Sequence, residues 1–283
     1  MFKIFLAAFS RKPFTLRAFS AALLSSALLA GSAHAAEEPI DFTTYSLEAL
    51  LDYEIFSVSK KPEKVFEAAA AVFIITAEDI RRSGWTNLPD MLRMVPGMQV
   101  ARSDPGDFAV SARGFIGEFA NKQLVLIDGR TIYSPIFSGV FWEYHDVMLE
   151  DIDRIEVIRG PGATMWGANA VNGVINIITR HAADTQGTLV TATVGNTHER
   201  YEALRYGGTI GDKLYYKLYA KHMQFGGVDN QLQNEPFTTR AGFRLDWEPT
   251  KADDIFISGS YYWGQEEANT LRPLSGRELE RTM

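Results

Sequence analysis

Side chains able to perform catalysis or to bind metal ions are scattered along this chain of 283 residues. There is no cysteine, which excludes disulfides and thiol catalysis. The segment from Gly162 to Gly167 has the spacing of a phosphate loop, but Ala168 occupies the position of the required lysine. No Gly-x-Ser-x-Gly nucleophile motif is present. The histidines show no metal-ligand spacing: His34, His145, His181, His198 and His222. The sequence therefore predicts no catalytic residue, no cofactor and no metal site.

The first 35 residues have the pattern of a secretory signal peptide. Four basic residues and no acidic residue precede a run of apolar and small residues from Ala18 to Gly31, and Ala33-His34-Ala35 follows as a cleavage site. The alternative is a membrane anchor, but a spanning helix needs about 20 apolar residues. Removal of the peptide leaves 24 basic against 35 acidic residues, a net charge of −11. Such a chain is a poor partner for nucleic acid.

The following part, up to about Arg180, combines short strands and helices with many turns. Ala71–Ile75 is predicted to be a buried strand. Thr76 and Asp79 are spaced as a capping box for the next helix, which Gly84 would end. A second short helix is expected over Leu88–Met94.

Four further strands are predicted in this part. Leu124–Ile127 and Thr131–Tyr133 flank Asp128-Gly129, which is a hairpin signal. Arg154–Ile158 and Val174–Thr179 complete the set. We expect a small mixed α+β domain.

From residue 181 on, the pattern changes to long segments in which apolar and polar residues alternate. One face of each segment is apolar with aromatics near the ends, and the other is polar, at about 10 residues per segment. This is typical of a transmembrane β-barrel, and short and long connections alternate as they do in such barrels. A soluble β-sandwich is the alternative. The five segments lie at Thr188–Val194, Arg200–Ile210, and from about Leu214, Arg240 and Ile255.

Several motifs in order resemble the plug domain of TonB-dependent outer-membrane receptors. The agreement of many blocks in sequence order is more specific than one short motif. The blocks are Ile80–Gly84, Leu92 to Gly97, Ser111–Phe115, Val125–Gly129, Arg154–Pro161, Trp166–Ala170 and Gly173–Thr179. The resemblance implies four parts: a signal peptide (1–35), an N-terminal extension (36–63), a plug domain (64–180) and about five strands of an incomplete, truncated barrel (181–283).

The resemblance also implies roles for particular residues. Arg113 and Arg159, each followed by glycine, correspond to arginines that seat the plug against carboxylates of the barrel, although either could be an ordinary surface arginine. The TonB box, which adds as a strand to TonB, is expected at Glu54, Ile55, Phe56, Ser57 and Val58. A structured linker is the alternative for this segment.

Two plug loops, 103–108 and 133–145, are expected to face outward toward a ligand. Their aromatic rings could stack on a bulky chelate, and packing against the barrel wall is the alternative reading. The candidate ligand contacts are Asp104, Phe108, Tyr133, Phe137, Phe141, Trp142 and Tyr144.

The implied function is uptake of a scarce ligand across the outer membrane, with an iron–siderophore complex as the expected cargo. Vitamin B12, heme or another metal chelate is the alternative cargo. The implied partners are TonB with its inner-membrane energising complex, outer-membrane lipid and the chelate. A different reading is a truncated periplasmic plug that binds TonB without transport, because five strands leave two open edges that lipid does not tolerate.

Overall fold

The computed structural model describes side chains in residues 70–102, 108–114, 122–134, 139–142, 144–160, 166–167, 169–195, 199–225, 236–250 and 253–265. It also describes the backbone of 54–55 and 63–64. The chain divides into two units, Met1–Thr44 and Tyr45–Met283, and all described residues lie in the second unit. The predicted signal peptide therefore lies outside the described residues. No helix of the described part is long and apolar enough to cross a membrane.

The first α/β element confirms the predicted capping box. Strand β3 (Ala71–Thr76) runs directly into helix α3 (Ala77–Ser83). The Thr76 side chain accepts a bond from the Asp79 backbone N–H, and the Asp79 carboxylate accepts one from the Thr76 N–H at 2.9 Å. Gly84 ends the helix in the left-handed conformation at φ 71°, which glycine adopts without the steric cost of a Cβ atom.

The second predicted helix is present in two pieces, α4 (Leu88–Met91) and the 3-10 turn η3 (Leu92–Met94). The Asn87 side chain caps α4 by accepting from the Asp90 N–H at 3.0 Å. A short two-stranded hairpin follows, formed by β4 (Met98–Arg102) and β5 (Phe108–Ala112).

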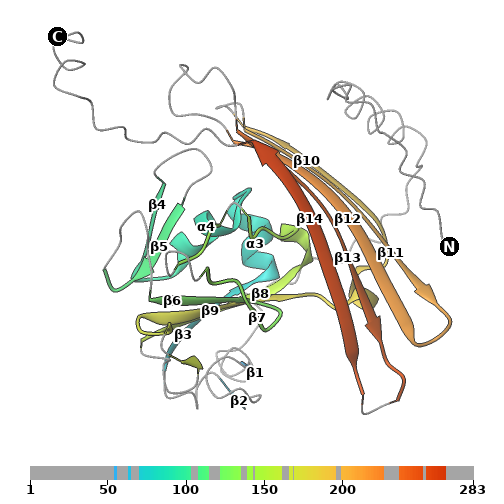
Figure 1. Cartoon of the computed structure of the whole chain (residues 1–283), viewed down its shortest axis with the longest axis horizontal. Helices are drawn as coiled ribbons and strands as arrows, with labels where there is room; N and C mark the ends of the chain where they lie inside the picture. Colours follow the sequence, from blue (N-terminus) through green and yellow to red (C-terminus); the bar gives the residue numbers. More distant parts are fainter. Residues whose placement is uncertain are drawn as a thin grey trace, which may run out of the picture. The chain divides into compact units, whose positions relative to one another are not determined.

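A mixed five-stranded sheet in the order β3-β8-β9-β6-β7 forms the centre of this part (Figure 1). Its remaining strands are β6 (Gln123–Ile127), β7 (Arg130–Thr131), β8 (Ile152–Arg159) and β9 (Gly173–Thr179). Strands β6 and β9 are parallel, and the other pairs are antiparallel. Gly173 is required at the start of β9, because a Cβ atom there would lie 2.2 Å from the Ile158 carbonyl oxygen.

The core of this α+β domain lies between the central sheet and the two helices. Ile155, Val157, Ile175 and Ile177 of β8 and β9 are completely buried in it. Each such side chain contributes about 1.5–3 kcal/mol of hydrophobic stabilisation. The 3-10 turn η4 (Leu149–Asp151) leads directly into β8.

After the turn η5 (Ala182–Thr185), five strands form a single antiparallel sheet, which we call the wall. The strands follow in chain order: β10 (Gly187–Val194), β11 (Arg200–Ile210), β12 (Leu214–Gln224), β13 (Phe237–Trp247) and β14 (Ile255–Gln265). These bounds confirm the five alternating segments.

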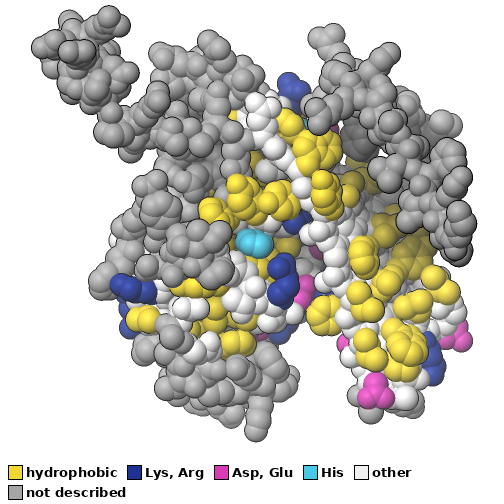
Figure 2. Space-filling model, in the orientation of Figure 1, with side chains coloured by type: hydrophobic (Ala, Val, Ile, Leu, Met, Phe, Trp, Pro, Cys, Tyr) yellow, Lys and Arg dark blue, Asp and Glu magenta, His cyan; other side chains and the backbone are white. Residues whose placement is uncertain are grey.

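The two faces of the wall differ in chemistry. Large apolar side chains are exposed on the face turned away from the α+β domain, among them Tyr206, Leu218, Phe243 and Trp247. Figure 2 shows hydrophobic side chains gathered over these strands. The opposite face carries lysine and arginine, and it contacts the α+β domain. In a soluble sandwich the apolar face would be the covered one, so this arrangement favours the barrel type of strand.

Candidate functional site

Four cations lie in two directly opposed pairs on the inner face of the wall. Lys217 of β12 is the register partner of Arg244 of β13, and Lys221 is the partner of Arg240. Like charges in directly opposed positions destabilise a sheet. Lys217, Lys221 and Arg240 are at least 93% buried, so water cannot screen these pairs effectively. Within the wall, the buried Asp246 carboxylate pairs with Arg244 at 2.8 Å, so the two lysines need anions from outside the wall.

The α+β domain supplies these anions from the segment that leads into β8. The Lys221 ammonium forms an ion pair with Asp146 and donates to the Val147 carbonyl oxygen at 2.7 Å. The Lys217 ammonium lies 3.2 Å from the Asp151 carboxylate and donates to the Arg180 carbonyl oxygen at 2.9 Å. Both lysines are thus satisfied by groups of the α+β domain.

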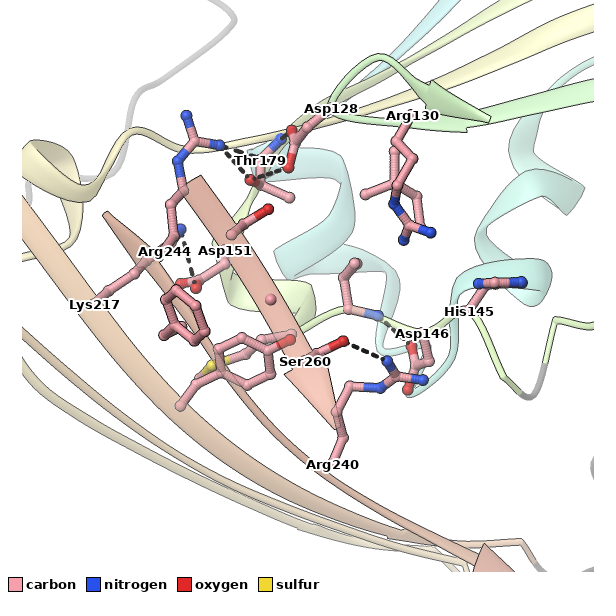
Figure 3. A pocket seen from close by; sticks show the side chains of 17 residues that line it. Asp128, Arg130, His145, Asp146, Asp151, Thr179, Lys217, Arg240, Arg244 and Ser260 are labelled. Atoms are coloured by element: carbon pink, nitrogen blue, oxygen red, sulfur yellow. Dashed lines mark hydrogen bonds and ion pairs between the residues drawn. The ribbon is translucent and has the colours of Figure 1, made fainter. Parts of the chain in front are cut away.

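Two arginines of the wall extend this network. Arg205 donates to the second oxygen of Asp151 at 2.5 Å. Arg244 donates to the Thr179 hydroxyl at 2.9 Å and lies 3.5 Å from the Asp128 carboxylate. Figure 3 shows Asp128, Asp151 and Thr179 of the α+β domain facing Lys217 and Arg244 of the wall. We call the whole set the docking network: Asp128, Asp146, Asp151, Arg205, Lys217, Lys221 and Arg244.

An apolar cluster accompanies the docking network. Met148, between the two aspartates, is buried against Tyr201, Met223 and Phe225 of the wall. The Tyr201 hydroxyl donates to the Glu150 carboxylate at 2.8 Å. The apolar contacts stabilise the interface in proportion to the apolar area that they bury. The ion pairs determine where the segment 146–151 lies, because a buried charge without its partner is costly.

A pocket of about 300 Å³ lies between the α+β domain and the wall. One end is lined by Asp128, Thr179 and Arg244, and the other by Arg130, His145 and Arg240 (Figure 3). The pKa of His145 is lowered to about 4 by burial first, and then by the positive charges of Arg130 and Arg240. At neutral pH this imidazole is therefore uncharged.

The two arginines predicted to seat the domain bind the backbone of the α+β domain itself. Arg159 donates to the Pro96 carbonyl oxygen at 2.6 Å, and Arg113 donates to the Arg159 carbonyl oxygen at 3.0 Å. The Arg159 Nε atom is buried and has no hydrogen-bond partner among the described residues. Among the described residues, no carboxylate forms an ion pair with Arg113 or Arg159.

The predicted ligand-contact residues do not form one group. Phe108 and Trp142 are each 5% exposed and belong to the core, so neither ring is presented to solvent. Tyr144 stacks on Tyr262 of the wall at a centroid distance of 5.3 Å, and Phe141 packs on Tyr144 at 5.2 Å. The Tyr144 ring therefore packs against the wall, and the Phe141 ring packs on Tyr144.

The other candidates are only partly described. Tyr133 is half-buried against the apolar cluster around Val174. Asp104 and Phe137 lie outside the described residues. Within the predicted TonB box, Glu54 and Ile55 form strand β1, which pairs antiparallel with β2 (Glu63–Lys64). Phe56, Ser57 and Val58 lie outside the described residues.

The fold brings His181 near three carboxylates, which the spacing of residues along the chain did not indicate. Its Nε2 atom lies 3.6 Å from Asp246, 3.7 Å from Glu248 and 3.8 Å from Asp254. The Nδ1 atom accepts a bond from the Ala183 N–H at 3.2 Å. The Nε2 atom is buried and forms no hydrogen bond among the described residues, and its distances to Asp246 and Asp254 place these three side chains together as a set that could hold a metal ion.

Sequence reasoning identified the polar face of the wall but not the docking network. The available signal was the four-residue spacing of Lys217 and Lys221 and of Arg240 and Arg244, which places each pair on one face of a strand. Two such strands side by side carry an excess of positive charge. This excess predicts a negative partner surface.

Comparisons with known proteins agree with this architecture. The family model described as the TonB-dependent receptor plug domain matches residues 64–174. The vitamin B12 transporter BtuB of Vibrio cholerae is 32% identical over 160 residues, which cover 56% of this chain and 26% of the relative. The ferric enterobactin receptor of Pseudomonas aeruginosa is 31% identical over 273 residues, covering 88% of this chain and 35% of the relative.

Solved structures show the same fold. The ferripyoverdine receptor of the Pseudomonas aeruginosa outer membrane aligns with a TM-score of 0.59 at 17% identity, over 74% of this chain and 27% of its own. The siderophore receptor PirA of Acinetobacter baumannii aligns with a TM-score of 0.51 at 22% identity, over 68% of this chain and 31% of its own.

The chain spans only about a quarter to a third of the length of these relatives. Its α+β domain is followed by antiparallel strands, as in the receptors that it matches. Residues 64–174 are a TonB-dependent receptor plug domain, and the chain belongs with the TonB-dependent receptors.

Proposed function

We propose that this chain is part of an outer-membrane receptor that imports an iron–siderophore complex with energy from TonB. The main support is the plug domain held by buried charges against the polar face of a wall whose other face is apolar. A large exposed apolar surface requires an apolar partner, and lipid is that partner for outer-membrane strands.

The choice of a siderophore rests on the extent of the similarity. The ferric enterobactin receptor aligns over 88% of this chain, through both the plug and the wall, whereas the vitamin B12 transporter aligns over 56%. Vitamin B12 is the second candidate because its transporter has the higher identity, 32%.

TonB is the proposed energy-coupling partner, and Glu54–Val58 is its proposed contact. The described part, Glu54–Ile55, already forms strand pairs with Glu63–Lys64, so this backbone adopts the extended conformation that strand addition requires. Arg113 and Arg159 remain the proposed seating residues. The Arg159 Nε donor has no hydrogen-bond partner among the described residues, which supports pairing with a carboxylate.

The test is uptake by cells that lack their own siderophore and vitamin B12 receptors and express the complete gene. We expect radiolabelled iron to accumulate from a ferric siderophore, and accumulation to stop when TonB is deleted. Uptake of vitamin B12 alone would replace the siderophore proposal by the second candidate. Accumulation that persists without TonB would overturn the coupling.

A paired substitution tests the proposed TonB contact separately. Ile55→Pro removes one backbone N–H donor, whereas Ile55→Ala keeps it and shortens the side chain. We expect uptake to fall at least tenfold in the proline variant and to stay near the parent level in the alanine variant. Equal uptake by both variants would place the TonB contact elsewhere.

A further inference from the structure

One end of the pocket holds more positive charge than the described residues neutralise. Arg240 is 7% exposed, and no carboxylate of a described residue lies within 4 Å of its guanidinium group. Its donors bind neutral acceptors, the Ser260 hydroxyl at 3.0 Å and the Tyr144 carbonyl oxygen at 2.5 Å. A buried cation is ordinarily paired with an anion, so this arrangement indicates an anion from another source.

Two more side chains of the plug line the same end. Arg130, on the exposed strand β7, and His145 both border the pocket, and neither side chain has a hydrogen bond or an ion pair among the described residues. Figure 3 shows Arg130, His145 and Arg240 around this end, with Arg130 and His145 on the plug and Arg240 on the wall.

The nearest carboxylate does not remove the excess. Asp146 also lines this end, but its two oxygens are engaged by the Lys221 ammonium and by the Val147 backbone N–H at 2.9 Å. Arg130, Arg240 and Lys221 carry three positive charges and Asp146 carries one negative charge, so this end keeps a net charge of +2. The field of Arg130 and Arg240 also acts on His145, whose pKa is lowered to about 4 by burial and by these two charges.

We propose that this end of the pocket is a binding site for an oxyanion, a carboxylate or phosphate group, held between plug and wall by Arg130, Arg240 and His145. The guanidinium groups provide charge-assisted donors with the planar geometry that oxyanions prefer, and the neutral imidazole adds one N–H donor. The pocket volume of about 300 Å³ accommodates such a group. This proposal does not depend on the identity of the imported ligand.

The test is calorimetric titration of the purified chain in detergent micelles with sodium phosphate and, separately, with sodium citrate. The buffer contains chloride at matched ionic strength, so that general screening is equal in all runs. We expect saturable binding of at least one of the two anions. Binding of phosphate alone or of citrate alone would identify which oxyanion chemistry the site selects.

Arg130→Gln is the decisive variant, because this exposed side chain has no partner whose loss would perturb the fold. We expect it to weaken binding about tenfold, which corresponds to loss of one charge-assisted hydrogen bond. Arg200→Gln is the matched control, since Arg200 is an exposed cation of β11 outside the pocket. Absence of binding by both anions, unchanged affinity in Arg130→Gln, or an equal loss in Arg200→Gln would overturn the proposal.

Discussion

Lys221 and Arg240 lie directly opposite each other on strands β12 and β13, and both point toward the plug. The plug provides a different partner for each. The Asp146 carboxylate forms an ion pair with Lys221, whereas the Tyr144 carbonyl oxygen only accepts a hydrogen bond from Arg240. At these two opposed positions, Lys221 is neutralised and Arg240 is not neutralised by a carboxylate of a described residue. The ion pair of Lys221 with Asp146 holds the plug against the wall, and Arg240 lies at the proposed anion site.

Removing Lys221 should destabilise the contact between plug and wall strongly. In Lys221→Met the buried Asp146 carboxylate loses its partner, and such a loss costs about 3–5 kcal/mol. The double variant Lys221→Met/Asp146→Asn should cost less than the sum of the two single changes, because it leaves no unpaired charge. Urea unfolding in detergent measures all three free energies. Strict additivity would show that the two side chains do not interact.

The stability of the chain should fall as the pH decreases from about 6.5 to about 4, partly because of His145. Its pKa is about 4 in the folded state and about 6.5 in the unfolded chain, so the unfolded chain binds the proton more readily in this window. Allowing for partial solvent screening, the loss is about 1–2 kcal/mol. Unfolding of the parent and of His145→Gln at pH 7 and pH 5 measures it. A pH dependence that is the same in both proteins would exclude His145 as the cause.

Gly173→Ala should destabilise the central sheet of the plug. Its new Cβ atom would lie 2.2 Å from the Ile158 carbonyl oxygen, so the backbone of β8 or β9 must move. We expect a cost of at least about 1–3 kcal/mol, as for other overpacked sites. Gly84→Ala is a useful comparison, because its Cβ atom meets nothing within 4 Å and only the positive φ resists the change. Thermal unfolding should rank the Gly173 variant as the less stable of the two.

Thr76→Ala should cost about 1 kcal/mol through the loss of the helix cap. The Asp79 backbone N–H then has no acceptor from the side chain of residue 76, and α3 should fray at its first turn. Thr76→Ser keeps the hydroxyl and should stay within a few tenths of a kcal/mol of the parent. Amide hydrogen exchange of residues 77–80 reports the fraying directly. Equal protection in the alanine and serine variants would contradict the capping role.

Local patterns in the sequence were sufficient to predict most of the elements. The Thr76–Asp79 capping box, the Asp128-Gly129 turn and the alternating residues of β10–β14 all depend on neighbours within a few positions. Such interactions can be recognised from residue types and spacing alone. The order of the plug motifs was likewise enough to identify the family, which the match to residues 64–174 confirmed.

The contacts between plug and wall could not be predicted in the same way. Lys221 and Val147 are 74 residues apart in the sequence, and Arg240 and Tyr144 are 96 apart. Their meeting depends on the register of β12 against β13, where a slip of one residue would turn every lysine to the opposite face. The sequence alone therefore determined the elements, the polarity of each strand face and the family. Only the tertiary structure decided which charges meet, because electrostatic pairing depends on distances of a few ångströms between segments that are remote in the chain.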